Sequence, residues 1–328
     1  MNLQKGAVLK MFDITTMGEL LYDFSFCGKS DRGNSIYEAN PGGAPANVAV
    51  GAKRLGAKTA FLGKIGSDGL SQVLKNTLDI NGVDTTGLIL SPDYNSTITF
   101  VQLDKKGDRS FSFYRNNTAD INITVGDINK DIILNSRILH VGSVTLTDEP
   151  ARSATIFAVK TAHENGLIVS YDPNFRPMLW HDKKVARGII SSILPLCDIL
   201  KVSEEELSLI TGLNDIPASM AMLYEQYNIP LIFTTLGADG SIWQFKTQTG
   251  KAAAFDVKTI DTTGAGDAFV AAVLYKIACV YGGIDNLSAT DVVKIAEYAS
   301  AASSLATTVT GAIPSLPYSE QVEILIAK

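Results

Sequence analysis

The segment best suited to chemistry runs Asp261-Thr262-Thr263-Gly264-Ala265-Gly266-Asp267 and leads into a strongly apolar helical pattern, Ala268–Tyr281. Its small fourth to sixth residues let successive backbone N–H groups face one point at the positive end of that helix, which predicts an anion cradle, usually for phosphate. The carboxylate of Asp267 suits this place if it takes a proton from an attacking hydroxyl while the amides stabilise the transferred group. Alternatively, Asp267 complements the helix dipole and the glycines form a tight turn.

A second glycine-rich segment, Pro41-Gly42-Gly43-Ala44-Pro45-Ala46-Asn47, precedes the helical pattern Val48–Leu55. The paired glycines allow a ligand to approach the backbone, Pro45 suits a first helical turn, and Asn47 could hydrogen-bond hydroxyls. The alternative is a closely packed helix start. Neither segment is a Walker A loop, and no Gly-x-Gly-x-x-Gly follows a strand, which argues against a nicotinamide dehydrogenase.

Composition narrows the class of protein. The 328 residues are 46% hydrophobic and 19% charged, with a net charge of −6, which predicts a compact globular core. The sequence contains no basic stripe of the kind that binds nucleic acid, so we do not expect a nucleic-acid partner. No apolar run reaches the roughly 18 residues of a membrane span, and Met1–Phe12 lacks a secretory pattern. Three scattered cysteines predict reduced thiols in a cytoplasmic protein, not a disulfide frame or zinc site.

The elements that must position these residues alternate between short β-branched runs and helical patterns. Examples are Thr59–Ile65 before Asp68–Asn81 and Leu167–Tyr171 before Lys183–Leu194. Strands separated by helices predict βαβ crossovers, and hence a single α/β domain with a mainly parallel sheet covered on both faces. Glycines expected to end helices are Gly56, Gly82, Gly166 and Gly212.

Two regions, about 13–40 and 96–115, contain strand patterns without helices between them, and Lys105-Lys106-Gly107-Asp108 reads as a hairpin turn. They predict a small β-sheet that projects from the core and can cover a pocket as a lid. The alternative is an ordinary extension of the sheet.

Together, these segments resemble the signatures of the ribokinase-like, or phosphofructokinase-B, sugar kinases. Gly42–Asn47 with Gly63-Lys64-Ile65-Gly66-Ser67-Asp68 is similar to the N-terminal signature, and Asp261–Asp267 to the C-terminal one. The resemblance covers essentially the whole chain. It implies a three-layer α/β/α core with a small β lid, and in-line transfer of the γ-phosphoryl group of ATP. Asp267 would be the base, and the backbone of Gly264, Ala265 and Gly266 the anion hole.

The resemblance also implies cofactor sites. Thr235, Gly237 and Gly240 lie in a stretch similar to the family's nucleotide motif, and Ser300 falls where the family often contacts the nucleotide. Ser203 and Glu206 match an Asn-x-x-Glu motif that organises Mg²⁺, with Ser replacing Asn; the pair is equally a helix capping box. Asp261, Thr263 and Ser315 fit a K⁺ site found in some members.

For the sugar, the stretch Gly18-Glu19-Leu20-Leu21-Tyr22-Asp23-Phe24 resembles the first strand of fructokinases. The resemblance implies that Asp23 binds sugar hydroxyls beside Gly42, Gly43 and Asn47. Stretches around Arg115 and from Tyr171 to Pro177, with Asn174 and Arg176, resemble both fructokinases and 2-keto-3-deoxygluconate kinases; either arginine could instead form a structural ion pair. We expect fructose, phosphorylated at its 6-hydroxyl. Alternatives are 2-keto-3-deoxygluconate, ribose, or a catalytically silent sugar-binding regulator. Family analogy implies a homodimer joined through the lid.

Overall fold

A computed structural model of the protein describes residues 10–103 and 109–328. Its centre is a nine-stranded sheet in the order β13-β12-β11-β10-β9-β8-β1-β4-β5. Neighbouring strands from β5 to β11 are parallel, and β12 and β13 extend the β11 edge in antiparallel pairings. The strands are β1 (Phe12–Met17), β4 (Thr59–Gly66), β5 (Asp84–Ser91), β8 (Ser136–Val141), β9 (Ile168–Tyr171), β10 (Ile199–Ser203), β11 (Leu231–Thr235), β12 (Ser241–Phe245) and β13 (Gln248–Ala252).

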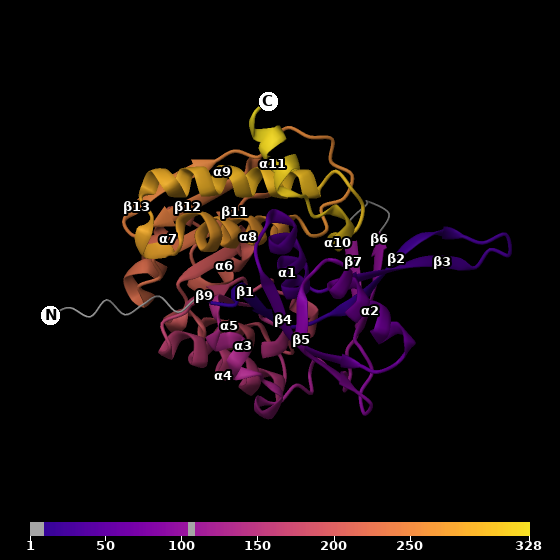
Figure 1. Cartoon of the computed structure of the whole chain (residues 1–328). Coiled ribbons are helices and arrows are strands. Elements are labelled where there is room, and N and C mark those ends of the chain that lie inside the picture. Colours follow the sequence, from indigo (N-terminus) through magenta and orange to yellow (C-terminus); the bar gives the residue numbers. More distant parts are fainter. Residues whose placement is uncertain (1–9, 104–108) are drawn as a thin grey trace.

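Helices cover both faces of this sheet (Figure 1). One apolar core joins the sheet to α3 (Lys130–Leu134), α4 (Ala151–Glu164), α5 (Lys183–Ser191), α6 (Glu204–Thr211) and α7 (Ile216–Tyr227). On the other face, a second core joins it to α1 (Ala44–Leu55), α8 (Ala265–Tyr275), α9 (Ala289–Ala306) and α11 (Ser319–Ile326). The helix α2 (Gly69–Ile80) packs against β5 and shares a third apolar cluster with α1, and the short α10 (Ala312–Ser315) follows α9. The α/β/α architecture predicted from the sequence is confirmed.

A separate four-stranded sheet, in the order β3-β2-β6-β7, projects from the core at the right of Figure 1. We call it the lid sheet; it comprises β2 (Leu21–Lys29), β3 (Ser35–Gly42), β6 (Ile98–Leu103) and β7 (Arg109–Tyr114). The predicted lid boundary near residue 13 was wrong, because Phe12–Met17 forms β1 inside the central sheet, between β8 and β4. The predicted hairpin turn at Lys105–Asp108 lies outside the described residues.

Local sequence signals explain where the helices begin and end. The Asp68 side chain caps α2 by accepting the Ser71 N–H, as N-cap carboxylates do. The glycines expected to stop helices all have positive φ, from 70° to 121°: Gly56, Gly82, Gly166 and Gly212. Across the part of the chain that is described, no helix is both long and apolar enough to cross a membrane. The three cysteines are free.

Candidate active site

Polar residues gather where the parallel strands end. Asp172 follows β9, Lys201 lies within β10, Ser203 ends β10, and Thr235 ends β11. In open parallel sheets, ligands bind outside the carboxyl ends of the strands. The topology therefore brings together side chains that are far apart in the sequence.

Asp267 lies in the first turn of α8, where its side chain meets two amides. Its Oδ2 accepts a hydrogen bond from Asn47 Nδ2 at 2.7 Å, and its Oδ1 accepts one from Asn174 Nδ2 at 3.3 Å. Asn174 has φ 44°, a left-handed conformation that asparagine tolerates better than most residues. Three predicted site residues from α1, α8 and the loop after β9 thus form one cluster.

Close packing of α1 against α8 explains this meeting. One turn beyond Asn47, Gly51 faces Ala271, which lies one turn beyond Asp267. A Cβ added at Gly51 would lie only 2.8 Å from the Cβ of Ala271, so the two helices approach as closely as glycine permits. The small residues of α1 therefore set the distance between the Asn47 amide and the Asp267 carboxylate.

The environment of Asp267 adjusts its acidity. Burial raises its pKa to about 6, the Asn47 hydrogen bond opposes the rise, and the nearby Asp172 adds to it, while Lys201 and Arg176 favour the ionised form. A carboxylate with a pKa near 6 is mostly ionised at neutral pH yet basic enough to take a proton.

The predicted anion cradle separates two cavities. Gly264 has φ 79° and a Cβ there would lie 3.1 Å from Ala312 Cα, so only glycine fits this turn without strain. Gly264 lines one cavity, Ala265 lines the other, and Gly266 lines both. The ammonium group of Lys201 lies beside them, because a Cβ at Gly266 would be 3.2 Å from Lys201 Nζ.

We call the first space the acceptor cavity. It has a volume of about 230 Å³, and its lining includes the carboxylate of Asp267 and the lid residues Leu21, Asp23 and Phe113. Its remaining walls include the predicted residues Gly43, Asn47, Asn174 and Arg176. Gly42 is not part of the wall, but it makes room for Asp23, because a Cβ there would lie 2.9 Å from Asp23 Oδ2.

The second space, the nucleotide cavity, has a volume of about 540 Å³. It is lined by the four predicted residues Thr235, Gly237, Gly240 and Ser300. The Ser300 hydroxyl is buried and has no hydrogen-bond partner among the described residues. Buried hydroxyls normally have partners, so a hydroxyl left open at a cavity wall is suited to a ligand. Thr262 and Gly266 belong to both cavities, which therefore meet at the anion cradle.

Arg115 is not brought into the acceptor cavity. Its guanidinium donates to Asp120 at 2.6 Å, to Thr147 Oγ1 at 2.7 Å and to the Val144 carbonyl at 3.0 Å. The pKa of Asp120 is lowered because, although burial opposes its charge, Arg115 and two hydroxyls outweigh that effect. Arg115 therefore forms a structural ion pair, the alternative weighed from the sequence, whereas Arg176 lies at the cavity.

Ser203 and Glu206 form the capping box of α6. Ser203 Oγ accepts the Glu206 N–H at 3.2 Å, and Glu206 Oε2 accepts the Ser203 N–H at 2.7 Å. Glu206 Oε1 also accepts the Phe175 N–H at 2.6 Å. Neither residue lines the two cavities, so a role with Mg²⁺ or nucleotide stays a prediction. A carboxylate has about four acceptor sites, so Glu206 keeps capacity for a water molecule.

The residues predicted to bind K⁺ lie in two loops that Asp261 connects. Asp261 Oδ1 accepts the Thr263 N–H at 2.7 Å, and its Oδ2 accepts the Gly311 N–H at 3.0 Å. The Ser315 hydroxyl is buried and donates to the Ala312 carbonyl at 2.8 Å. Asp261 thus connects its own loop to the loop at Gly311, as the predicted K⁺ site requires. Binding of K⁺ itself stays a prediction.

Three charged residues of the site were missed as candidates. Lys201 Nζ contacts Asp172 Oδ2 at 2.9 Å, with both side chains nearly buried. Burial opposes the charge of Lys201, but Asp172 and Glu206 hold its pKa above the usual value. The third residue, Glu19, lines the acceptor cavity and is 4% exposed. A lysine inside the apolar strand Ile199–Ser203 was the available signal, because charges are rarely buried without a function or a partner.

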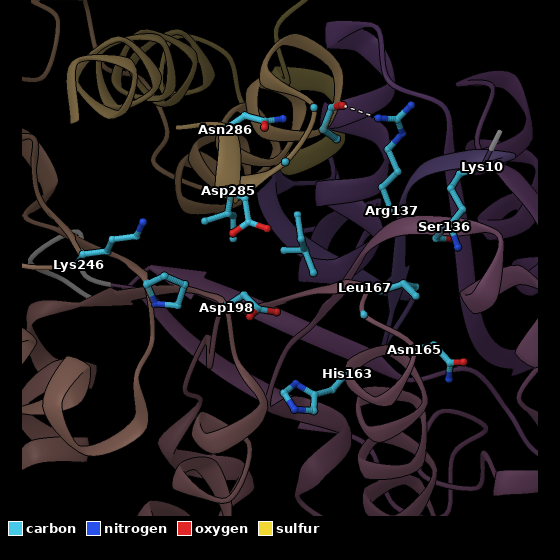
Figure 2. A pocket seen from close by; sticks show the side chains of 17 residues that line it. Lys10, Ser136, Arg137, His163, Asn165, Leu167, Asp198, Lys246, Asp285 and Asn286 are labelled. Atoms are coloured by element: carbon cyan, nitrogen blue, oxygen red, sulfur yellow. Dashed lines mark hydrogen bonds between the residues drawn. The ribbon is translucent and has the colours of Figure 1, made fainter. Parts of the chain in front are cut away.

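A third cavity, of about 590 Å³, lies at the opposite end of the sheet (Figure 2). Ser136 and Ile168 open β8 and β9 there, and Asp198 precedes β10. Figure 2 shows Asp198 and Asp285 among well-separated basic side chains. This cavity faces the amino ends of the strands and contains none of the predicted site residues, so it is not the candidate active site.

Comparisons with known proteins identify the family of this chain. A model of the pfkB family carbohydrate kinases matches residues 11–318. Fructokinase-1 of Zea mays is 39% identical over 320 residues, which cover 96% of this chain and 98% of the relative. The solved structures that are similar to this chain include two fructokinases. A fructokinase from Xylella fastidiosa with bound ATP has a TM-score of 0.89 and 33% identity, covering 96% of this chain and 98% of that one. A double mutant of a fructokinase from Vibrio cholerae O395, with fructose, ADP and potassium ion bound, has a TM-score of 0.86 and 32% identity, covering 97% and 99%.

Proposed function

Because this chain belongs to the pfkB family of carbohydrate kinases, and so is an ATP-dependent sugar kinase, we propose that it phosphorylates fructose at the 6-hydroxyl. The observation that carries the proposal is the carboxylate of Asp267, held by Asn47 and Asn174 at the wall of the acceptor cavity, next to Gly266, where the two cavities meet. Fructose follows from the similarity to fructokinases and from a small acceptor cavity bordered by Asp23 and the lid sheet.

In the proposed reaction, Asp267 takes the proton of the acceptor hydroxyl as its oxygen attacks the γ-phosphorus of ATP. A new O–P bond forms on the sugar, and the bond from the γ-phosphorus to the bridging oxygen breaks, which releases ADP. The backbone N–H groups of Gly264, Ala265 and Gly266 stabilise the charge on the transferred group. Lys201 and Arg176 add positive charge beside the carboxylate. Electrostatic stabilisation and positioning supply most of the catalysis in phosphoryl transfer.

We place the nucleotide against Thr235, Gly237, Gly240 and Ser300. Mg²⁺ bound with ATP would supply positive charge that neutralises the phosphates. Glu206 is proposed to act through water, since both its oxygens already accept backbone N–H groups.

We also propose activation by K⁺ near Asp261, Thr263 and Ser315. Asp261 fixes the two loops that flank the anion cradle, so a cation there would stabilise the cradle in its binding geometry. Turnover should rise when K⁺ replaces a large organic cation at constant ionic strength; equal rates in the two buffers would count against this proposal.

A coupled assay of ADP formation tests the function with fructose, ribose, adenosine and 2-keto-3-deoxygluconate as acceptors. Fructose should give the highest kcat/KM. A higher value for ribose or 2-keto-3-deoxygluconate would replace fructose with that sugar. Sugar binding without turnover of any acceptor would favour a silent regulatory protein, and the intact Asp267 cluster argues against that outcome.

A further inference from the structure

Asp172 is a buried carboxylate at the carboxyl end of β9, and the proposed reaction gives it no role. It is 3% exposed and does not line the acceptor cavity or the nucleotide cavity as the structure describes them. β9 and β10 are parallel neighbours, and their register pairs Tyr171 with Leu200. The next residue of each chain segment, Asp172 on one side and Lys201 on the other, therefore lies beside its counterpart, because paired strands run about 4.8 Å apart.

Both oxygens of Asp172 hold other residues of the site. Oδ2 accepts a hydrogen bond from Lys201 Nζ at 2.9 Å. Oδ1 accepts the N–H of Asn174 at 3.0 Å, a bond that an aspartate often makes to the backbone two residues further on. Asn174 has φ 44°, and its amide donates to Asp267 at 3.3 Å. One carboxylate thus fixes both a cation and the amide beside the proposed base.

Lys201 stands where an anchored cation can act on a phosphate. Its Nζ lies beside the anion cradle, 3.2 Å from a Cβ added at Gly266, and its side chain lines the acceptor cavity. Burial opposes the charge of Lys201, but Asp172 outweighs this effect, so its pKa is raised and the ammonium group stays charged. An ammonium group has three N–H donors, so the bond to Asp172 leaves donors for phosphate oxygens.

Stability alone does not explain this ion pair. The cost of taking two charges out of water can exceed the gain from their attraction, so a buried ion pair often adds little net stability. A well-packed apolar pair of similar volume would serve the core as well. The pair instead lies next to the anion cradle and next to Asn174, which favours a role in the site.

We propose that Asp172 is a positioning residue for phosphoryl transfer, which holds the Lys201 ammonium at the anion cradle and the Asn174 amide against Asp267. The inference deepens the proposed function and rests on it. In the proposed reaction, Lys201 meets the transferred phosphoryl group while Asn174 keeps the carboxylate of Asp267 directed at the acceptor. Misplacing such groups by about 1 Å can slow a reaction about 100-fold.

The substitution Asp172→Asn separates the two bonds. The side-chain oxygen of asparagine can still accept the Asn174 N–H, but the side chain no longer attracts Lys201 by charge. We expect kcat to fall about 10- to 100-fold. The matched control is Asp93→Asn, at an exposed position just after β5, which should have the kcat of the wild type. A kcat within twofold of the wild type in Asp172→Asn would overturn the inference.

A double-mutant cycle shows whether Asp172 acts through Lys201. Lys201→Met should lower kcat at least as much as Asp172→Asn does. Adding Asp172→Asn to Lys201→Met should lower kcat by less than about twofold more, because the group that Asp172 holds is already absent. A further tenfold loss would refute the inference. The double variant leaves neither charge of the pair behind, so this comparison stands even if Asp172→Asn alone does not fold.

The pH profile of kcat/KM distinguishes positioning from a purely structural ion pair. Burial raises the pKa of Asp267; the negative charge of Asp172 adds to the rise, and the positive charge of Lys201 opposes it. The other charged groups that face Asp267 or line its cavity include Arg176, Glu19 and Asp23. The acid midpoint should therefore move to lower pH in Asp172→Asn and to higher pH in Lys201→Met. Both variants break the same pair, so midpoints that stay in place or move in one direction would count against this role.

Failure of the proposed function gives different results. If the wild type prefers another sugar, only fructose is replaced, and the variants are compared on that sugar. If the wild type turns over no acceptor, the proposed function and the role of Asp172 are refuted together. Normal turnover by the wild type, with an unchanged kcat in Asp172→Asn, refutes the role of Asp172 alone.

Discussion

Asp267 is the residue on which the proposed chemistry depends. In Asp267→Asn, the shape of the side chain is kept and the base is lost, so kcat should fall about 10²- to 10⁴-fold. ATP affinity and the thermal unfolding midpoint should change little, because the amide can still bond to its neighbours. Single-turnover kinetics and ATP titration measure the two effects. A variant with near-normal turnover would remove Asp267 from the role of base.

The pKa of Asp267 makes a separate prediction. The proton acceptor must be ionised, and burial raises its pKa to about 6. Activity should therefore be half lost near pH 6 and should fall further as the pH drops. Asn47 stabilises the ionised form through its 2.7 Å hydrogen bond, so Asn47→Ala should move this midpoint to higher pH. A pH profile of kcat/KM for both proteins checks the shift; an unmoved midpoint would show that another group limits the rate.

Among single residues, the sequence identified those that stand in recognisable motifs. It missed residues that join the site only through contacts between distant segments. Asp267, Asn47 and Asn174 stand in recognisable motifs, and they do meet. Lys201 and Glu19 become site residues only when the ends of β10 and β1 come together. Arg115 is a residue type that could bind a substrate, but its guanidinium is bound to Asp120 instead. No local pattern shows which partner a buried arginine will take.

Among the elements, the contact between α1 and α8 sets the geometry of the site. Gly51→Ala would put a methyl group 2.8 Å from Ala271 Cβ and force the helices apart. Overpacking costs about 1–3 kcal/mol, which should outweigh the gain of about 0.5–1 kcal/mol from replacing a helical glycine. We expect a lower free energy of unfolding and a reduced kcat, because Asn47 moves from Asp267. Chemical denaturation and steady-state kinetics measure both.

Gly188 in α5 provides the control for this substitution. It is exposed, and a Cβ there meets nothing within 4 Å. Gly188→Ala should therefore raise stability by about 0.5–1 kcal/mol without changing kcat. If the two alanine variants behaved alike, helix propensity and not helix spacing would explain the result.

Element boundaries were predicted well where a strand and a helix alternate. The pattern at Thr59–Ile65 corresponds to β4, which extends only one residue further, to Gly66. The error at β1 has a physical cause: only a short turn separates β1 from β2, so two strands of different sheets resemble one extended run. Hydrophobic pattern identifies a strand, but the partners of that strand are chosen by long-range packing.

For the whole molecule, the lid sheet carries the prediction about assembly. Its cavity face bears Asp23 and Phe113, and the opposite face bears linked aromatic rings, including Phe24, Phe100 and Tyr114. Alternate residues of a strand point to opposite faces. Tyr114 is 61% exposed. We propose that two copies of the chain pair through this aromatic face, because exposed apolar surface and open strand edges favour association.

Sedimentation equilibrium tests the pairing. The wild type should be a dimer, and Tyr114→Lys should shift it towards monomer. Val185→Lys is the matched control, since Val185 is similarly exposed but lies on α5, away from the lid sheet. A monomeric wild type, or dissociation by the control substitution alone, would contradict the lid-mediated dimer.

The shared boundary of the two cavities, at Thr262 and Gly266, has a consequence for the hydrolysis of ATP when no sugar is bound. In the proposed reaction, a nucleotide on one side of this boundary would expose its terminal phosphate to whatever fills the acceptor cavity. Without sugar, water beside Asp267 would then be a competing nucleophile. Hydrolysis of ATP would then be avoided only if Asp267 and the anion cradle adopt their catalytic arrangement after the sugar has displaced the water.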